Sequence, residues 1–370
     1  MKQKRNILAS IGMAFTAILM SLCTTSCEHI FDYIDACRYG VNLRFVYDYN
    51  MEYANAFPSK VDCVTLLVYD EDGNFVTSRT ETSDVLSNED YRMTIDLPPG
   101  NYRFVAYGGL ACDASSFTQL KEPSQSLMTD LQTLMNFSEG ASDKQLHPFF
   151  FGPWDTDVTK LFDGTTVVTV PDVLPSEIPA DQKGNYKDVA NGDVYVNHTI
   201  KMMKNTNNIR IVLQQLNGDP VSNEEFTIWI TDDNTKFRYD DVLMPNGMIT
   251  YHPWAEGQQS VGVTEEEGLP GVDKEVLVSY DEFSTSRLMA DSQARLVIVR
   301  NDTGDEIVNI PLVKYLLLLK SAAYADMGAQ EFLDRESEWN LIFFLDTKHA
   351  WMDTHIVIND WIIRFNDTEF

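Results

Sequence analysis

The chain has few cysteines and few basic residues, and each shortage argues against a class of protein. Its five cysteines, at positions 23, 27, 37, 63 and 112, include no CxxC pair and lack zinc-ligand spacing. Such a set predicts neither a disulfide scaffold nor a structural zinc site. The 28 lysines and arginines are outnumbered by 56 aspartates and glutamates, which gives a formal net charge of −28. Because phosphates are bound by basic side chains, we expect no binding to nucleic acid.

Recognisable catalytic motifs are also missing. The sequence contains no GxSxG elbow, Walker A loop, GxGxxG or HExxH, and its six histidines are spread out without ligand spacing. No particular carboxylate pair stands out for glycoside hydrolysis. Acidic turns at residues 70–74 and 232–234 offer oxygen ligands for Ca²⁺, but a hairpin turn explains each one better. We therefore expect a protein that is not an enzyme, with no catalytic residues, no cofactor, no metal and no small-molecule substrate.

The one long apolar segment lies at the N-terminus. Basic residues at positions 2–5 precede an uncharged, mostly apolar run at residues 7–22, and small residues follow at 24–26. This order is typical of a secretory signal. The run is too short to span a bilayer core of ~30 Å comfortably, which takes roughly 20 apolar residues. We predict that residues 1–26 are a lipoprotein signal peptide.

Cys27 follows those small residues directly, as in a bacterial lipobox, although Thr24 stands where such signals usually have leucine. Cleavage before Cys27 would make it the acylated first residue, and two or more acyl chains hold a protein on a membrane far better than one. We expect residues 27–40 to form a lipidated tether at the bacterial outer membrane. The alternative is an ordinary secreted protein with an accidental cysteine.

Three cysteines remain if Cys23 is removed and Cys27 is acylated. An odd number leaves at least one thiol unpaired. Cys63 and Cys112 can pair in an oxidising compartment, and the sequence leaves this question open.

The remainder of the chain is dominated by short alternating segments joined by glycine and proline turns, which predicts strands and a mainly β fold of sandwich type. Leu127, Leu131 and Leu134 have helical spacing and predict a helix within residues 123–137. A few other short helices are expected, one within residues 312–325. Residues 339–346 fit either a strand or a helix. Predicted strands lie at residues 43–49, 61–69, 91–97, 102–108, 209–216, 226–231, 236–239, 248–251, 276–280, 295–300, 306–310 and 361–365.

About 340 mature residues exceed one ordinary hydrophobic core and suit two domains. A polar stretch containing proline and glycine at residues 171–193 precedes a change of pattern near residues 205–208. We predict an N-terminal β-sandwich domain at residues 41–206 and a C-terminal one at residues 207–370.

The first predicted strands resemble a known family. The resemblance lies in residues 41–51 (VNLRFVYDYNM), Ala56-Phe57, 64–69 (VTLLVY) with Asp72-Gly73, and the terminal 356–361 (IVINDW). They are similar to the FimB/Mfa2 family, the fimbrial anchor lipoproteins of Bacteroides and Porphyromonas relatives. The resemblance implies two tandem transthyretin-like (Ig-like) sandwiches, a lipid anchor in the outer membrane, and fimbrial shaft (pilin) subunits as partners at the cell surface. Whether the subunit anchors the shaft, caps its tip or regulates its length stays open.

The same resemblance implies strand exchange between subunits, since an open sheet edge offers unpaired backbone groups to a donor strand. The alternating Trp361, Ile363 and Phe365 form the candidate donor strand. The alternative, which we favour, is that they form the last strand of their own domain.

A surface glycan-binding lipoprotein is the alternative function. It would need an exposed aromatic platform, for which four tryptophans are candidates. Apolar neighbours such as Ile228 and Ile230 beside Trp229 suggest core positions instead. The candidates are Trp154, Trp229, Trp254 and Trp351.

Overall fold

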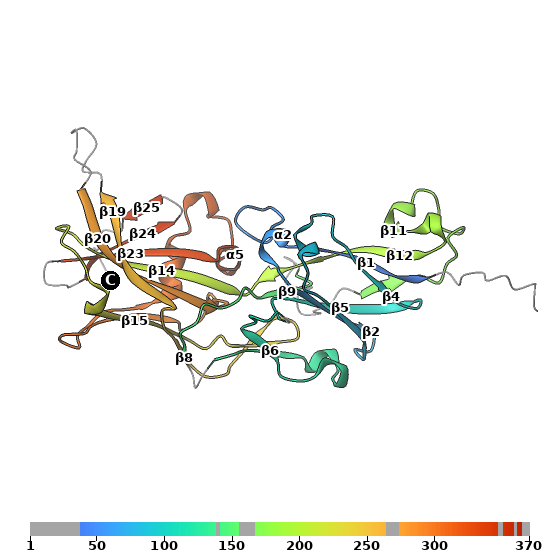
Figure 1. Ribbon diagram of the computed structural model, residues 1–370, viewed down its shortest axis with the longest axis horizontal. Coiled ribbons are helices and arrows are strands. Elements are labelled where there is room, and N and C mark those ends of the chain that lie inside the picture. The colour runs from blue at the N-terminus through green and yellow to red at the C-terminus, as the bar shows by residue number, and fades with distance from the viewer. Residues whose placement is uncertain are drawn as a thin grey trace, which may run out of the picture.

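The computed structural model describes residues 38–110, 112–137, 141–154, 167–263, 274–346, 351–358 and 361–364. These residues form five β-sheets and a few short helices, arranged along the elongated molecule of Figure 1. The prediction of a mainly β protein built from β-sandwiches is confirmed. The predicted signal at residues 1–26, Cys27 and most of the tether lie outside the described residues.

A first sandwich is built from two sheets, at the right of Figure 1. Sheet A has the order β11-β12-β1-β4, and sheet B has the order β13-β9-β5-β2-β3 with β10 also paired to β5. The bounds in sheet A are β1 (Tyr39–Val46), β4 (Met93–Asp96), β11 (Tyr186–Lys187) and β12 (Val194–Lys201). Those in sheet B are β2 (Val64–Asp70), β3 (Phe75–Glu81), β5 (Gly100–Gly108), β9 (Phe150–Gly152), β10 (Val167–Val170) and β13 (Met203–Lys204).

The core of this sandwich follows from the alternation in its strands. Leu43 of β1 and Leu66 of β2 are fully buried between the sheets, together with Phe104 of β5. The predicted acidic turn is confirmed as a hairpin between β2 and β3, because Asp70 Oδ1 accepts hydrogen bonds from the backbone N–H groups of Asp72 and Asn74. The Asn74 side chain also donates to the Asp70 carboxylate, and this hydrogen bond, followed by the backbone ones, lowers the pKa of the Asp70 carboxyl group.

Sheet B is buried on its other face as well. Leu67 and Tyr69 of β2 point away from the first core and pack into a second one. Burial on both faces explains why β2 is nearly continuous in apolar residues instead of alternating.

Sheet C covers this second face and contains strands from distant parts of the chain, in the order β17-β16-β7-β6. Phe117 and Phe149 stack with ring centroids 4.2 Å apart, and Phe237 lies 6.0 Å from Phe149. The strands are β6 (Phe117–Gln119), β7 (Gln132–Met135), β16 (Lys236–Arg238) and β17 (Leu243–Met244).

A second sandwich lies at the left of Figure 1 and consists of sheets D and E. Sheet D has the order β22-β21-β15-β18-β8, and sheet E has the order β19-β20-β14-β23-β24-β25. In sheet D the strands are β8 (Ala141–Ser142), β15 (Phe226–Asp232), β18 (Ile249–Tyr251), β21 (Arg295–Arg300) and β22 (Glu306–Pro311). In sheet E they are β14 (Thr206–Gln215), β19 (Ala255–Val263), β20 (Lys274–Ser286), β23 (Glu338–Leu345), β24 (Trp351–Ile358) and β25 (Trp361–Arg364).

Alternation in the central strands fills the second core. Ile209, Ile211 and Leu213 of β14 face Ile228 and Ile230 of β15 within one buried cluster. Burying a side chain of this size contributes about 1.5–3 kcal/mol.

The α-helices among the described residues are short: α2 (Phe57–Lys60), α4 (Leu312–Leu318) and α5 (Ala329–Arg335). The predicted helix at residues 123–137 is wrong, because this segment forms two 3₁₀ turns (Pro123–Gln125 and Met128–Asp130) followed by β7. Pairing of β7 with β6 and β16 outweighs the leucine spacing. The helix expected within residues 312–325 is shorter than predicted, and residues 339–346 form a strand.

The proposed boundary after residue 206 falls at the start of β14. However, β7 and β8 precede this point in the sequence and pair with β16 and β18, which follow it, and β6 pairs with β7. The two sandwiches therefore interlock through residues 117–142.

Candidate functional site

The predicted donor strand lies at one edge of sheet E. β25 pairs antiparallel with β24 of the same chain, with Trp361 opposite Ile358 and Ile363 opposite Ile356. No other described strand pairs with β25, so its second edge is open within the part of the chain that the structure describes. Phe365 and Cys27 lie outside the described residues.

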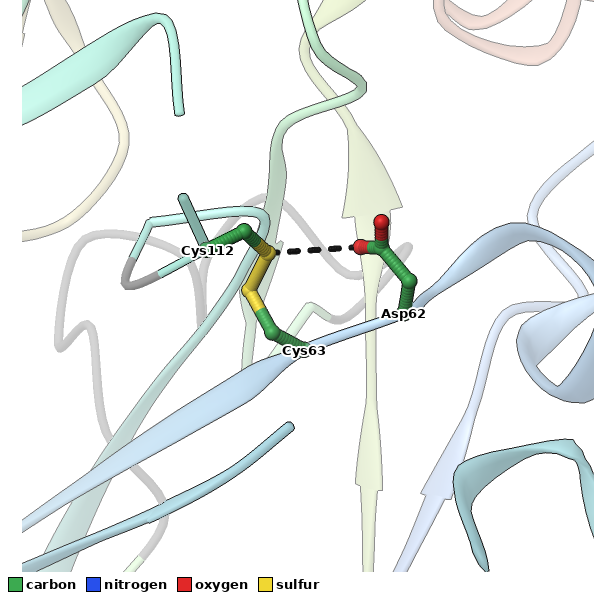
Figure 2. A group of neighbouring side chains, drawn as sticks. All are labelled: Asp62, Cys63 and Cys112. Atoms are coloured by element: carbon green, nitrogen blue, oxygen red, sulfur yellow. Dashed lines mark hydrogen bonds between the residues drawn. A yellow bond between two sulfur atoms is a disulfide. The ribbon is translucent and has the colours of Figure 1, made fainter. Parts of the chain in front are cut away.

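The sequence left the pairing of Cys63 with Cys112 open, and the structure joins them in a disulfide (Figure 2). Cys63 immediately precedes β2, and Cys112 follows β5, the strand beside β2. Cys112 lies at the start of the segment that forms β6 and β7 of sheet C and β8 of sheet D. The disulfide therefore ties the beginning of this segment to sheet B.

Asp62 lies against this disulfide. Its Oδ1 is 3.3 Å from Sγ of Cys112, the contact dashed in Figure 2, and 3.0 Å from Nε2 of His147. A disulfide sulfur carries no hydrogen, so His147 is the group that can donate to the carboxylate. The Asp62, Cys63 and Cys112 ligand atoms lie within 4.8 Å of one another, but metal ligation requires free thiolates. The covalent bond therefore excludes a metal centre here.

A buried ion triad lies where the sandwiches meet. Arg287, which follows β20, donates from Nε and Nη2 to the two carboxylate oxygens of Asp334 on α5, each at 2.8 Å. Its Nη1 donates to Asp241 Oδ2 at 3.2 Å, and Asp241 Oδ1 accepts from Asn205 at 2.6 Å. Burial lowers the pKa of Arg287, but the two carboxylates outweigh this effect and raise it. The guanidinium is therefore charged, held on both sides.

Two arginines of the second sandwich also cover aromatic rings of the first. Arg287 lies over Trp154 with its guanidinium carbon 5.3 Å from the ring centroid. Arg335 lies 4.1 Å from the Tyr49 centroid and 4.5 Å from that of Tyr53. Each such contact stabilises by about 0.5–2 kcal/mol. Tyr49, Trp154 and Met203 form a small buried cluster beside them.

Beside this junction is a cavity of about 690 Å³, which we call the acidic cavity. Trp154 and Arg287 form part of its wall, and five aspartates line it. Asp232 is 2% exposed, its Oδ1 accepts from the Asp233 backbone N–H, and its Oδ2 has no hydrogen-bond partner among the described residues. Burial raises the pKa of Asp232 to about 6.

A second cavity, of about 630 Å³, lies beside the disulfide. Lys60, Asp84 and His147 line it together with small polar residues. Its two cysteines, Cys63 and Cys112, are bonded to each other, so neither offers a free thiol as a nucleophile.

The three tryptophans whose side chains are described, Trp154, Trp229 and Trp254, differ in their exposure to solvent. Trp154 is buried at the junction, whereas Trp229 is partly exposed on the outer face of sheet D. Ile228 and Ile230 point inward on either side of it, so the inference from these neighbours that Trp229 is a core residue does not hold. Trp254 is partly buried beyond β18, and only the backbone of Trp351 is described.

Sequence reasoning missed the junction residues Arg287, Arg335, Asp241 and Asp334. Arginine within an apolar segment would signal a buried ion pair, but Arg287 follows Ser286 and Arg335 lies between two acidic residues, so the sequence gives no such signal. Nothing local to the sequence indicates which carboxylates either arginine meets.

Among the described residues, no helix is both long and apolar enough to cross a membrane.

The chain is similar to proteins of known fold. A sequence model of the family described as fimbrillin-A associated anchor proteins Mfa1 and Mfa2 matches residues 34–367. No curated protein sequence matches the chain. A candidate adhesin from Bacteroides thetaiotaomicron is 47% identical with a TM-score of 0.75, over 90% of this chain and all of that one.

Two further solved structures share the fold. A candidate polysaccharide-binding protein from the same organism is 26% identical with a TM-score of 0.68, over 90% of this chain and 99% of that one. The fimbrial anchor protein Mfa2 from Porphyromonas gingivalis is 15% identical with a TM-score of 0.56, over 89% of this chain and 99% of that one. At this identity the last comparison speaks to the fold alone.

Proposed function

Since the chain belongs to the family of fimbrillin-A associated anchor proteins Mfa1 and Mfa2, we propose that it anchors fimbriae, or regulates their assembly, at the bacterial outer membrane. The match over residues 34–367 is the observation that carries this proposal. The absence of catalytic motifs in the sequence agrees with a structural role, and we propose that the protein is not an enzyme.

The membrane attachment that we propose is acylation of Cys27 after removal of residues 1–26. An N-terminal tether would place the sandwiches in water at the cell surface. Replacing Cys27 by serine should release the protein from the outer-membrane fraction into the medium. A variant that stays membrane-bound without acylation would contradict the tether.

For contact with pilin subunits, we propose pairing at the open edge of β25. An edge strand presents unpaired N–H and C=O groups that a partner strand can satisfy together. Pairing of β25 with β24 supports the alternative from the sequence, in which residues 361–365 belong to their own domain. In that arrangement β25 receives a partner strand without leaving its sheet.

Deleting residues 360–370 tests this contact. Under our proposal the truncated protein keeps its secondary structure and denaturation midpoint but no longer co-purifies with sheared fimbriae. The matched control deletes residues 366–370 alone, which keeps β25 (Trp361–Arg364), and it should still co-purify with sheared fimbriae. Unchanged co-purification of a folded truncation would reject β25 as the contact.

Carbohydrate binding is the second candidate function, favoured by the outward position of Trp229. In the strand register Trp229 of β15 lies opposite Val297 of β21, and Arg295, two residues before Val297, is on the same face of the sheet. A hydrogen bond from Nη2 of Arg295 to the backbone O of Asn309 fixes the Arg295 side chain. A partly exposed ring beside fixed polar groups can stack on a sugar. Replacing Trp229 by alanine should then abolish retention on polysaccharide, while the buried Trp154 offers no such contact.

A further inference from the structure

The acidic cavity has more negative charge than its own residues neutralise. Among the ionised side chains that line it, Arg287 is the cation, and it is paired with Asp241 and with Asp334 behind the wall. Asp240 is paired with Arg238. For the other three carboxylates, those of Asp232, Asp233 and Asp291, the described residues provide no ion pair.

The unneutralised negative charge of the acidic cavity can be assigned to a particular residue, Asp232. It is nearly fully buried, yet Oδ2 receives no hydrogen bond from the described residues, and the neighbouring Asp233 adds a second negative charge. A buried carboxylate without a compensating partner is costly, and a cation nearby removes much of that cost. The cavity therefore favours a positively charged occupant.

The rim of the cavity selects among cations. Met244, Met248 and Met289 line it together with Leu243 and Val242, and Met248 is 55% exposed. Flexible methionine side chains adapt to aliphatic chains of varied shape and recur on protein-binding surfaces. A lysine or arginine side chain has the matching form, an apolar stem that ends in a charge.

A bound metal ion fits these residues less well. Ca²⁺ gathers six to eight oxygen ligands at 2.3–2.6 Å. Within the described residues, no three carboxylates of this cavity have ligand atoms within 4.8 Å of one another. Asn234 is also occupied, because its amide group donates to the carbonyls of Ser286 and Arg287 and accepts from Tyr251.

We propose that the acidic cavity binds a basic side chain, lysine or arginine, of a partner protein, with its stem on the methionine rim and its charge at Asp232 and Asp233. This proposal adds a binding site to the proposed function, and it rests on that function in one respect: both assume that the chain binds a partner protein. Because Trp154 and Arg287 form the cavity wall, an occupant also contacts both sandwiches at their junction.

The test uses the purified full-length protein with ¹³C-labelled methionine methyl groups and Nα-acetyl-lysine methylamide as the probe. We expect saturable NMR shifts of Met244, Met248 or Met289 with a dissociation constant of about 1 mM, as for a fragment of this size. The norleucine counterpart, which has a similar stem without charge, should cause no saturable shift.

Two variants and one control sharpen the result. Asp232→Asn with Asp233→Asn should weaken lysine binding about tenfold, because a charged hydrogen-bonding pair is lost. Met248→Gln, at an exposed position, should weaken it without affecting the core. Asp326→Asn removes an exposed carboxylate elsewhere and should leave binding unchanged.

Three outcomes would overturn the proposal: no shift at these methyl groups, equal shifts with norleucine, or shifts caused by calcium chloride in the absence of any lysine effect. The last would assign the cavity to a metal ion. None of these outcomes depends on Cys27 or on β25, so failure here is separate from failure of fimbrial anchoring.

Discussion

The guanidinium of Arg287 lies over the ring of Trp154, 5.3 Å from its centroid, and so joins the two sandwiches by a charged contact in a buried setting. The same guanidinium is held by Asp334 and Asp241. The relative orientation of the two sandwiches thus depends on the guanidinium of Arg287, a buried positive charge that the two carboxylates must neutralise.

Removal of Arg287 should therefore be strongly destabilising. In Arg287→Met both carboxylates stay buried without their cation, and we expect a loss of about 3–5 kcal/mol in the free energy of unfolding. Chemical denaturation measures it. The exposed pair of Lys121 with Asp130 is the control, since Lys121→Ala should cost below about 1 kcal/mol. An equally small change in both variants would contradict a structural role for the triad.

The disulfide should contribute through the unfolded chain. Cys63 and Cys112 are separated by 49 positions, and closing a loop of that length stabilises by about 4 kcal/mol in the chain-entropy treatment. Cys63→Ala with Cys112→Ala should lower the thermal midpoint, and dithiothreitol should lower the wild-type midpoint similarly. If dithiothreitol lowers the midpoint of the double variant just as much, the disulfide is not the cause.

Phe149 should be important for the contact between sheets B and C. It is fully buried, stacks on Phe117 and lies 6.0 Å from Phe237 across the interface. Phe149→Ala should cost about 3–5 kcal/mol because it leaves a cavity. Leu174, which is 51% exposed, is a control at which alanine should change stability by less than about 0.5 kcal/mol.

Stability should fall as pH rises from about 4 to 7, in part because of Asp281. This side chain of β20 lies opposite Ile211, and burial, with Glu256 nearby, raises its pKa to about 7. Between the ordinary pKa of about 3.9 and this value the folded state binds more protons than the unfolded state, so increasing pH favours unfolding.

Asp281→Asn removes this dependence. The variant should gain stability relative to wild type at pH 8, by at least about 1.4 kcal/mol more than at pH 4, as judged by denaturant midpoints. The same difference at both pH values would show that Asp281 titrates alike in the folded and unfolded chains.

Local pattern predicted much of the fold because it reports which face of a strand is buried. Alternation identified the strands around Leu43 and Ile209, and the acidic turn at Asp70 gave the first hairpin. The segment around Leu131 was wrongly predicted as a helix. Its leucines have helical spacing, but the segment leads into β7, a strand whose partners lie elsewhere in the chain. For Trp229 alternation held, but its apolar neighbours suggested the wrong face.

The sequence by itself determined the β composition, the acidic surface, the turns and the family resemblance, because these depend on residue type and near neighbours. Tertiary structure alone decided that strands on both sides of residue 206 share a sheet, that Cys63 meets Cys112, and that Arg287 lies between Trp154 and two carboxylates. Those contacts join residues that are 46 to 133 positions apart. Which residues meet in these contacts depends on how complete sheets pack against one another, and a local sequence pattern does not contain that information.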